Sequence, residues 1–117
     1  MNKVSEEDYI EEDGVNLVIS TASINESKNI AKTLVEEKLA ACVNIFNVTS
    51  FYKWNDKLEE DTEDLLIIKT VKKNTSEIIK RIRDIHSYDL PEIITVPING
   101  GYKEYIRWVE ENCKRDI

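Results

Sequence analysis

The sequence predicts an α+β domain in which four antiparallel strands form one sheet and two helices pack on one face of it. The length of 117 residues suits one compact domain, and 41% hydrophobic residues suffice for a core. Four segments have the composition or alternation of strands, and three have helical spacing. Their order is β-α-β-β-α-β followed by a further helix, which is the order of the ferredoxin-like fold.

The first half of the chain begins with an acidic stretch. We expect residues 1–13 to form a flexible acidic tail and residues 14–117 to form the folded domain. The β-branched segment Val15–Ser20 predicts the first strand. Ser23 and Glu26 then have the spacing of a capping box, which predicts the start of a helix that runs to about residue 38.

The longest predicted feature is a β-hairpin. Its first strand, Cys42–Trp54, carries large residues on both faces, so we expect both faces to contact protein. Residues 55–57 predict a turn, and the chain returns through an acidic stretch to the strand Leu65–Val71. This hairpin exceeds the usual strand length, and the helices of one domain cannot cover it. We therefore expect part of it to project and to pair with another subunit.

The second half repeats the pattern of helix and strand. The segment Asn74–Glu77 is a second capping signal, for a helix that ends at His86 or one residue before it. After a polar turn, the apolar run Ile93–Ile98 predicts the last strand. Residues 99–101 predict a turn, and hydrophobic residues at helical spacing from 102 to 113 predict a final helix.

Charge and composition exclude several classes of function. The net charge of -7 argues against nucleic acid as a partner, because binding it requires Lys and Arg to neutralise phosphates. No apolar run reaches transmembrane length, and the acidic start is unlike a secretory leader, so we expect a cytoplasmic protein without membrane insertion. Cys42 and Cys113 lie far apart and predict neither a disulfide nor a zinc site.

No catalytic motif stands out. The sequence contains no phosphate-binding GxxxxGK[ST] loop, no HExxH motif and no Ser-His-Asp arrangement. Acylphosphatases share the order of elements, but the loop at residues 21–25 lacks the arginine of their phosphate cradle. We therefore expect binding activity without catalysis.

The only histidine, His86, is the leading candidate for a metal ligand. Imidazole suits Cu(II), and the nearby carboxylates of Asp89 and Glu92 are possible further ligands. Alternatively, His86 is a cation at a helix C-terminus or a structural histidine.

A second group of residues predicts an intersubunit cleft or ligand site, formed by Tyr52, Trp54, Lys69 and Tyr88. Packing within an interface is the alternative for the aromatic members. Lys69 either pairs with Glu92 or a carboxylate of a neighbouring strand, or binds an anion in a pocket. The charge run from Glu59 to Asp64 is typical of a solvated face, although it is also able to hold hard cations weakly.

Several segments together resemble the CutA (CutA1, divalent-cation tolerance) family across about residues 15–113. They are Glu37–Asn44, Ser50–Trp54, Leu66–Thr70, Tyr88 with Pro91 and Glu92, and Val96–Ile98. The resemblance implies a ferredoxin-like fold and a tight homotrimer whose long hairpins pair between subunits. It also implies binding of copper or related divalent cations and a part in the response to metal ions.

The resemblance also shows where this sequence departs from bacterial members associated with copper. Their ligands are a cysteine at the end of the first strand and two adjacent histidines before the Tyr-x-x-Pro turn. Here these positions hold Ser20 and the pair Ile85-His86. The alternative function is a trimeric regulator or scaffold, similar to PII signalling proteins. It would bind a small molecule or a protein partner in the intersubunit cleft, without a physiological metal.

Overall fold

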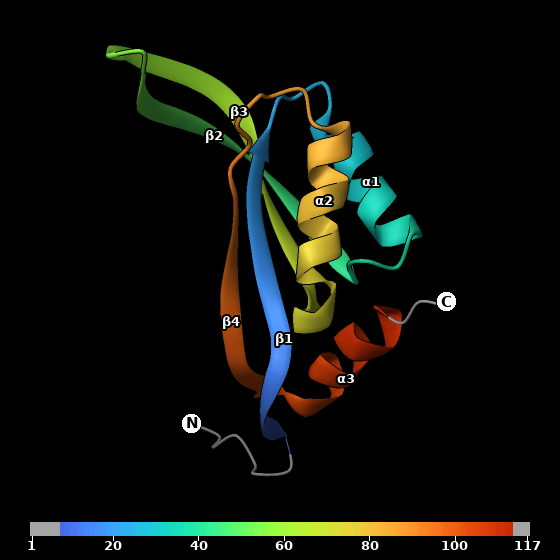
Figure 1. The fold of residues 1–117 in the computed structure, drawn as a ribbon. Coiled ribbons are helices and arrows are strands. Elements are labelled where there is room, and N and C mark those ends of the chain that lie inside the picture. Colours follow the sequence, from blue (N-terminus) through green and yellow to red (C-terminus); the bar gives the residue numbers. More distant parts are fainter. Residues whose placement is uncertain (1–7, 114–117) are drawn as a thin grey trace.

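The computed structural model describes residues 8–113, and within this range it leaves the side chains of residues 12 and 13 undescribed. The elements are β1 (Tyr9–Ala22), α1 (Ser27–Glu36), β2 (Cys42–Trp54), β3 (Lys57–Val71), a 3-10 turn (Lys72–Asn74), α2 (Thr75–Ile85), β4 (Ile93–Tyr102) and α3 (Lys103–Asn112). The strands form one antiparallel sheet in the order β2-β3-β1-β4, with α1 and α2 side by side on one face (Figure 1). The predicted ferredoxin-like fold is therefore confirmed. No helix within the described range is long and apolar enough to cross a membrane.

The hydrophobic core lies between the sheet and its helices. Alternate residues of β1 and β3, among them Val18, Leu66 and Ile68, pack against Ile30 of α1 and Ile82 of α2, and all five are buried. A second cluster packs the C-terminal helix α3 against the lower end of β1 and β3 (Figure 1). The opposite face of the sheet has no helix and stays apolar, with Phe46 50%, Ile94 52% and Val96 38% exposed.

The hairpin of β2 and β3 extends beyond the helices (Figure 1). Its turn has positive φ at both central residues, Asn55 (52°) and Asp56 (63°), which is the backbone of a type I′ hairpin turn. Pairing continues from Trp54–Lys57 at the tip to Cys42–Lys69 at the base. The prediction that the second strand begins at residue 65 was wrong, because the acidic stretch before it is itself part of β3.

The outer strands are also longer than predicted. β1 begins at Tyr9, so the expected tail ends earlier, and its residues 1–7 lie outside the described part of the chain. β4 continues through residues 99–101, which the sequence predicts as a turn. The two extensions pair with each other at Glu11–Gly100 and Ile10–Gly101, beyond a shift in register before Val15. The glycines therefore mark a close approach of two strands and not a turn.

The capping residues have roles other than those predicted. α1 begins at Ser27, and the Ser23 hydroxyl donates to the Glu26 carboxylate (3.0 Å) instead of capping the helix. Asn74 precedes α2, but its side-chain amide donates to the carbonyl oxygens of Leu39 and Cys113, both at 3.2 Å. The Asn74 side chain therefore connects segments that are distant in the sequence.

Gly100 offers a direct test of the strand extension. A Cβ atom at this position would lie 2.3 Å from the Ile10 carbonyl oxygen, and the φ of 155° disfavours other residues. We expect Gly100→Ala to lower the free energy of unfolding by about 1 to 3 kcal/mol, measured by urea denaturation. Gly101→Ala is the matched control, since its Cβ would meet Ile106 at an ordinary 3.4 Å. Equal stability of the two variants would contradict the β1–β4 pairing.

Candidate functional site

A cleft of about 760 Å³ lies between the β2–β3 hairpin and the connection from α2 to β4. Its lining includes four aromatic residues, four carboxylates and one lysine. They are Phe51, Tyr52, Trp54 and Tyr88; Asp61, Glu63, Asp89 and Glu92; and Lys53. Strand alternation accounts for much of this set, because residues 52 and 54 share one face of β2 and residues 61 and 63 share one face of β3. The cleft is therefore aromatic on its walls and acidic in its charge.

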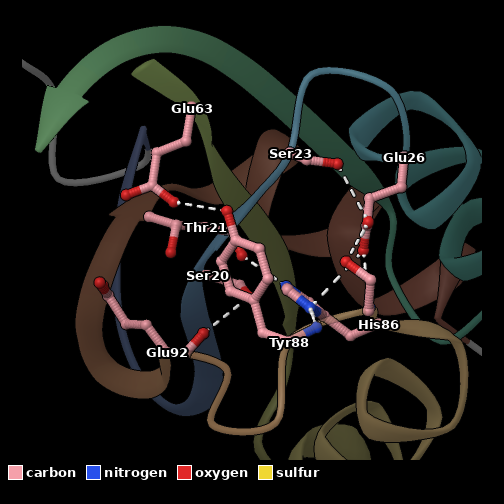
Figure 2. A network of polar contacts seen from close by, with 9 residues as sticks. Ser20, Thr21, Ser23, Glu26, Glu63, His86, Tyr88 and Glu92 are labelled. Atoms are coloured by element: carbon pink, nitrogen blue, oxygen red, sulfur yellow. Dashed lines mark hydrogen bonds and ion pairs between the residues drawn. The ribbon is translucent and has the colours of Figure 1, made fainter. Parts of the chain in front are cut away.

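Two tyrosines of the cleft are each held by a carboxylate. The Tyr52 hydroxyl donates to Asp61, and this bond raises the pKa of Tyr52 to about 12. The Tyr88 hydroxyl donates to Glu63 Oε1 at 3.1 Å (Figure 2). Burial and this hydrogen bond raise the pKa of Tyr88 to about 12. Both rings are thus fixed as neutral donors throughout the physiological pH range.

His86 lies behind the cleft and points into the protein. Its side chain is fully buried, with Nε2 2.6 Å from the Thr21 carbonyl oxygen. A carbonyl only accepts, so Nε2 carries the proton, while Nδ1 accepts from the Tyr88 N–H at 3.0 Å. Both ring nitrogens are therefore occupied by bonds that join the end of β1 to the turn after α2. The ring also meets Tyr88 edge-on, with 4.5 Å between centroids.

Glu26 secures the same turn from the other side (Figure 2). Its carboxylate accepts from the Ser87 backbone N–H (2.9 Å), from the Ser87 hydroxyl (2.5 Å) and from Ser23. Burial alone would raise the pKa of Glu26, but these hydrogen bonds outweigh it and hold the pKa below its usual value. Together, Glu26 and His86 fix the backbone that places Tyr88 against the cleft.

The residues expected to hold a metal are not brought together. Asp89 and Glu92 line the cleft, but His86 does not, and Figure 2 shows the Glu92 side chain extending away from the imidazole. Ser20, at the position of the ligand cysteine in the resemblance, donates to the Glu92 carbonyl at 2.7 Å. Among residues 8–11 and 14–113, whose side chains the structure describes, no three His, Cys, Asp or Glu residues form a group that could hold a metal ion. The donors of a single chain therefore do not fit a copper site centred on His86.

Lys69 lies apart from the cleft of the single chain. This residue pairs with Leu17 and Cys42 near the base of β3, about 20 Å along the strand from Glu63 at roughly 3.3 Å per residue. Its ammonium lies 5.6 Å from the ring centroid of Tyr105, on α3. Lys69 therefore does not line this cleft, whereas Tyr52, Trp54 and Tyr88 do, and their place between subunits stays a prediction.

Two cleft residues, Asp61 and Glu63, were predicted only as members of the charge run from Glu59 to Asp64. They belong to a charge run that is typical of a solvated face, yet Glu63 is only 7% exposed. Their signal is the spacing of residues 59, 61 and 63, which places three carboxylates on one face of a strand. This period becomes informative only once β3 is known to begin at Lys57.

Replacing Glu26 tests the attachment of the turn. We expect Glu26→Gln to lower the free energy of unfolding at pH 7 by about 1 to 2 kcal/mol, because hydrogen bonds to a charged acceptor are lost. The pKa of Glu26 is lower in the folded chain than in the unfolded chain, where it is about 4.3. The stabilisation by Glu26 is therefore present above the unfolded-state pKa and is lost as the pH falls through the folded-state pKa. Urea denaturation from pH 7 to 3 should show the stabilities of variant and parent converging in acid. Glu36→Gln, at an exposed position of α1, serves as the control.

Comparisons with known proteins agree with this fold. The family model described as "CutA1 divalent ion tolerance protein" matches residues 15–112. The divalent-cation tolerance protein CutA of Archaeoglobus fulgidus is 42% identical over 98 residues, which are 84% of this chain and 96% of that protein. The solved structure of the Thermus thermophilus divalent cation tolerance protein is 41% identical, with a TM-score of 0.82 over 86% of this chain and 99% of the other. A solved structure described as a PII-like protein CutA from Nostoc sp. PCC 7120 is 27% identical, with a TM-score of 0.82 over 86% and 99% of the two chains. Since the family match spans most of its folded part, this chain belongs to the CutA1 divalent ion tolerance protein family.

Proposed function

We propose that this protein is a non-enzymatic, cytoplasmic homotrimer that binds Cu(II) or a related divalent cation and contributes to the response to metal ions. The observation that carries the proposal is the charge of the cleft, where four carboxylates face a single lysine. Such an excess of negative charge raises the local concentration of cations. The description of the matched family as divalent ion tolerance proteins supports a divalent ion as the ligand.

In this proposal the donors are carboxylates and not His86. Both nitrogens of His86 already form hydrogen bonds, and releasing them would detach the turn that holds Tyr88. Asp89 and Glu92 are exposed on the cleft side, where their oxygens are accessible. Because the described residues contain no complete ligand set, donors from a second subunit are needed to complete a tight site.

The homotrimer is supported by surfaces that a single chain leaves uncovered. The helix-free face of the sheet exposes Phe46, Ile94 and Val96, and the hairpin exposes Trp54 at 48% and Leu58 at 72%. The long strand β2 is also an edge of the sheet, with unpaired backbone groups along its outer side. Pairing between hairpins of symmetric copies would cover both the edge and the apolar side chains.

The metal proposal is tested by calorimetric titration of Cu(II), in a background with both cysteines replaced by serine. We expect saturable binding that His86→Ala leaves unchanged, provided the variant is folded, and that Asp89→Asn with Glu92→Gln weakens about tenfold or more. The control is the double variant Glu36→Gln with Glu60→Gln, which makes the same change in net charge. Binding lost on replacing His86 in a folded variant would contradict the role of the carboxylates, and no saturable binding at all would contradict the metal proposal.

The assembly proposal is tested by sedimentation and by thermal unfolding at several protein concentrations. We expect one trimeric species whose melting midpoint rises with concentration, because the association stabilises the folded chain. Ile94→Asp should dissociate the trimer by placing a charge on the helix-free face, whereas Ile24→Asp, at a 53% exposed position outside the sheet, should not. A parent protein that sediments as a stable folded monomer would exclude the homotrimer.

A trimeric regulator or scaffold, comparable to PII-like proteins, is the second candidate function. The observation in its favour is the aromatic lining of the cleft, because flat apolar rings suit a small organic molecule or a protein side chain better than a hydrated ion. The description of the Nostoc structure as a PII-like protein supports the same candidate. It predicts that ligand binding in the cleft needs no metal.

A further inference from the structure

Two carboxylates share one face of β3 without a cation between them. Asp61 and Glu63 are two positions apart, so their side chains leave the strand on the same side, and both line the cleft. Glu63 is only 7% exposed. Among the residues whose side chains the structure describes (8–11 and 14–113), no lysine or arginine forms an ion pair with either group. Burying a carboxylate is strongly unfavourable unless a cation or several hydrogen bonds compensate it.

Two tyrosine hydroxyls surround this carboxylate pair. Tyr88 donates to Glu63 Oε1 at 3.1 Å (Figure 2), and Tyr52 donates to Asp61 Oδ2. Burial raises the pKa of Tyr88 most, and the negative charges of both Glu63 and Asp61 raise it further, which indicates that both carboxylates lie near this hydroxyl. Each hydroxyl uses its proton on one carboxylate oxygen. The second oxygen of each carboxylate and the lone pairs of the two phenols therefore remain as acceptors toward the cleft.

This set of acceptors indicates the kind of cation. Hard divalent metal ions take about six or more oxygen ligands, more than two carboxylates and two phenols supply. A primary ammonium needs only one acceptor for each of its three N–H groups. Its alkyl chain is apolar and suits the aromatic walls of the cleft. The carboxylate pair is therefore better matched to an aliphatic amine than to a metal ion.

We infer that the cleft binds a linear diamine or polyamine, with one primary ammonium held between Asp61 and Glu63. Its N–H groups donate to the carboxylate oxygens that the tyrosines leave free. Four carboxylates face a single lysine in the cleft, so negative charge remains to attract a second ammonium of the same molecule.

The amine site is separate from the hairpin tip and from the proposed metal ligands. Asp61 pairs with Ser50 and Glu63 with Val48, so both lie toward the middle of the hairpin and not at the tip that the proposed trimer would cover. The inference uses the same cleft as the proposed function, but it involves a different pair of carboxylates and requires no metal.

Calorimetric titration of putrescine into the intact protein tests the inference. A chelator removes metal ions, and about 0.15 M salt screens non-specific attraction. We expect saturable binding that Glu63→Gln weakens about tenfold or more, because a charge-assisted hydrogen bond is lost. Glu60→Gln makes the same charge change at an exposed position on the opposite side of β3 and should leave the affinity within about twofold. No saturable binding, or equal weakening by both variants, would overturn the inference.

The permethylated analogue of putrescine separates recognition from charge. It carries the same two positive charges on quaternary nitrogens, which have no N–H to donate. Because the carboxylate pair is inferred to accept hydrogen bonds from an ammonium, we expect this analogue to bind about tenfold more weakly or not at all. Equal affinity for the two compounds would show general electrostatic attraction and would contradict the inference.

A further variant keeps the test valid if Glu63→Gln does not fold, as judged by circular dichroism. Asp61 is more exposed than Glu63, so Asp61→Asn should remain folded and should also weaken putrescine binding about fivefold or more. Unchanged affinity in this folded variant would contradict the shared ammonium site. Saturable Cu(II) binding without putrescine binding would refute this inference and leave the proposed function intact, and the reverse result would do the opposite.

Discussion

The register of the β2–β3 hairpin determines both the core and the cleft. The two-residue turn at Asn55 and Asp56 fixes which residues of the strands face each other. With this register, Leu66 and Ile68 face the helices, while Asp61 and Glu63 face the cleft. A shift by one residue would exchange the two sets and bury charges in the core. The position of every cleft residue on this hairpin therefore follows from a turn at its far end.

The opposite wall of the cleft depends on contacts between distant parts of the chain. His86 bonds to Thr21 at the end of β1, and Glu26 before α1 bonds to Ser87. These bonds fix the turn after α2. Tyr88 is therefore held against Glu63 although it lies in neither a helix nor a strand. A histidine that resembles a candidate ligand in the sequence thus acts as a connector between segments. The carboxylates of the cleft remain the groups accessible to a ligand.

Much of the fold was predictable because its strands and helices have clear periods, and the alternation of β2 places Tyr52 and Trp54 on one face. The rest depended on information that the local sequence does not contain. Glycines at 100 and 101 indicate a turn or a close approach equally well, and only the pairing with Ile10 and Glu11 decides between them. The direction of the His86 ring depends on a carbonyl 65 positions earlier. Likewise, Glu63 is only 7% exposed and accepts a hydrogen bond from Tyr88 in a distant turn, whereas its charge alone suggested a solvated face.

The side chain of Asn74 has a consequence for the order of folding. Its amide bridges the Leu39 carbonyl, 35 positions earlier, and the Cys113 carbonyl, 39 positions later. Thr70 donates to the same Leu39 oxygen at 2.7 Å. Because these bonds close long loops, the entropy of loop closure must be overcome before they form. We therefore expect the end of α3 and the segment just before β2, which Asn74 connects, to protect their amide hydrogens from exchange as one cooperative unit.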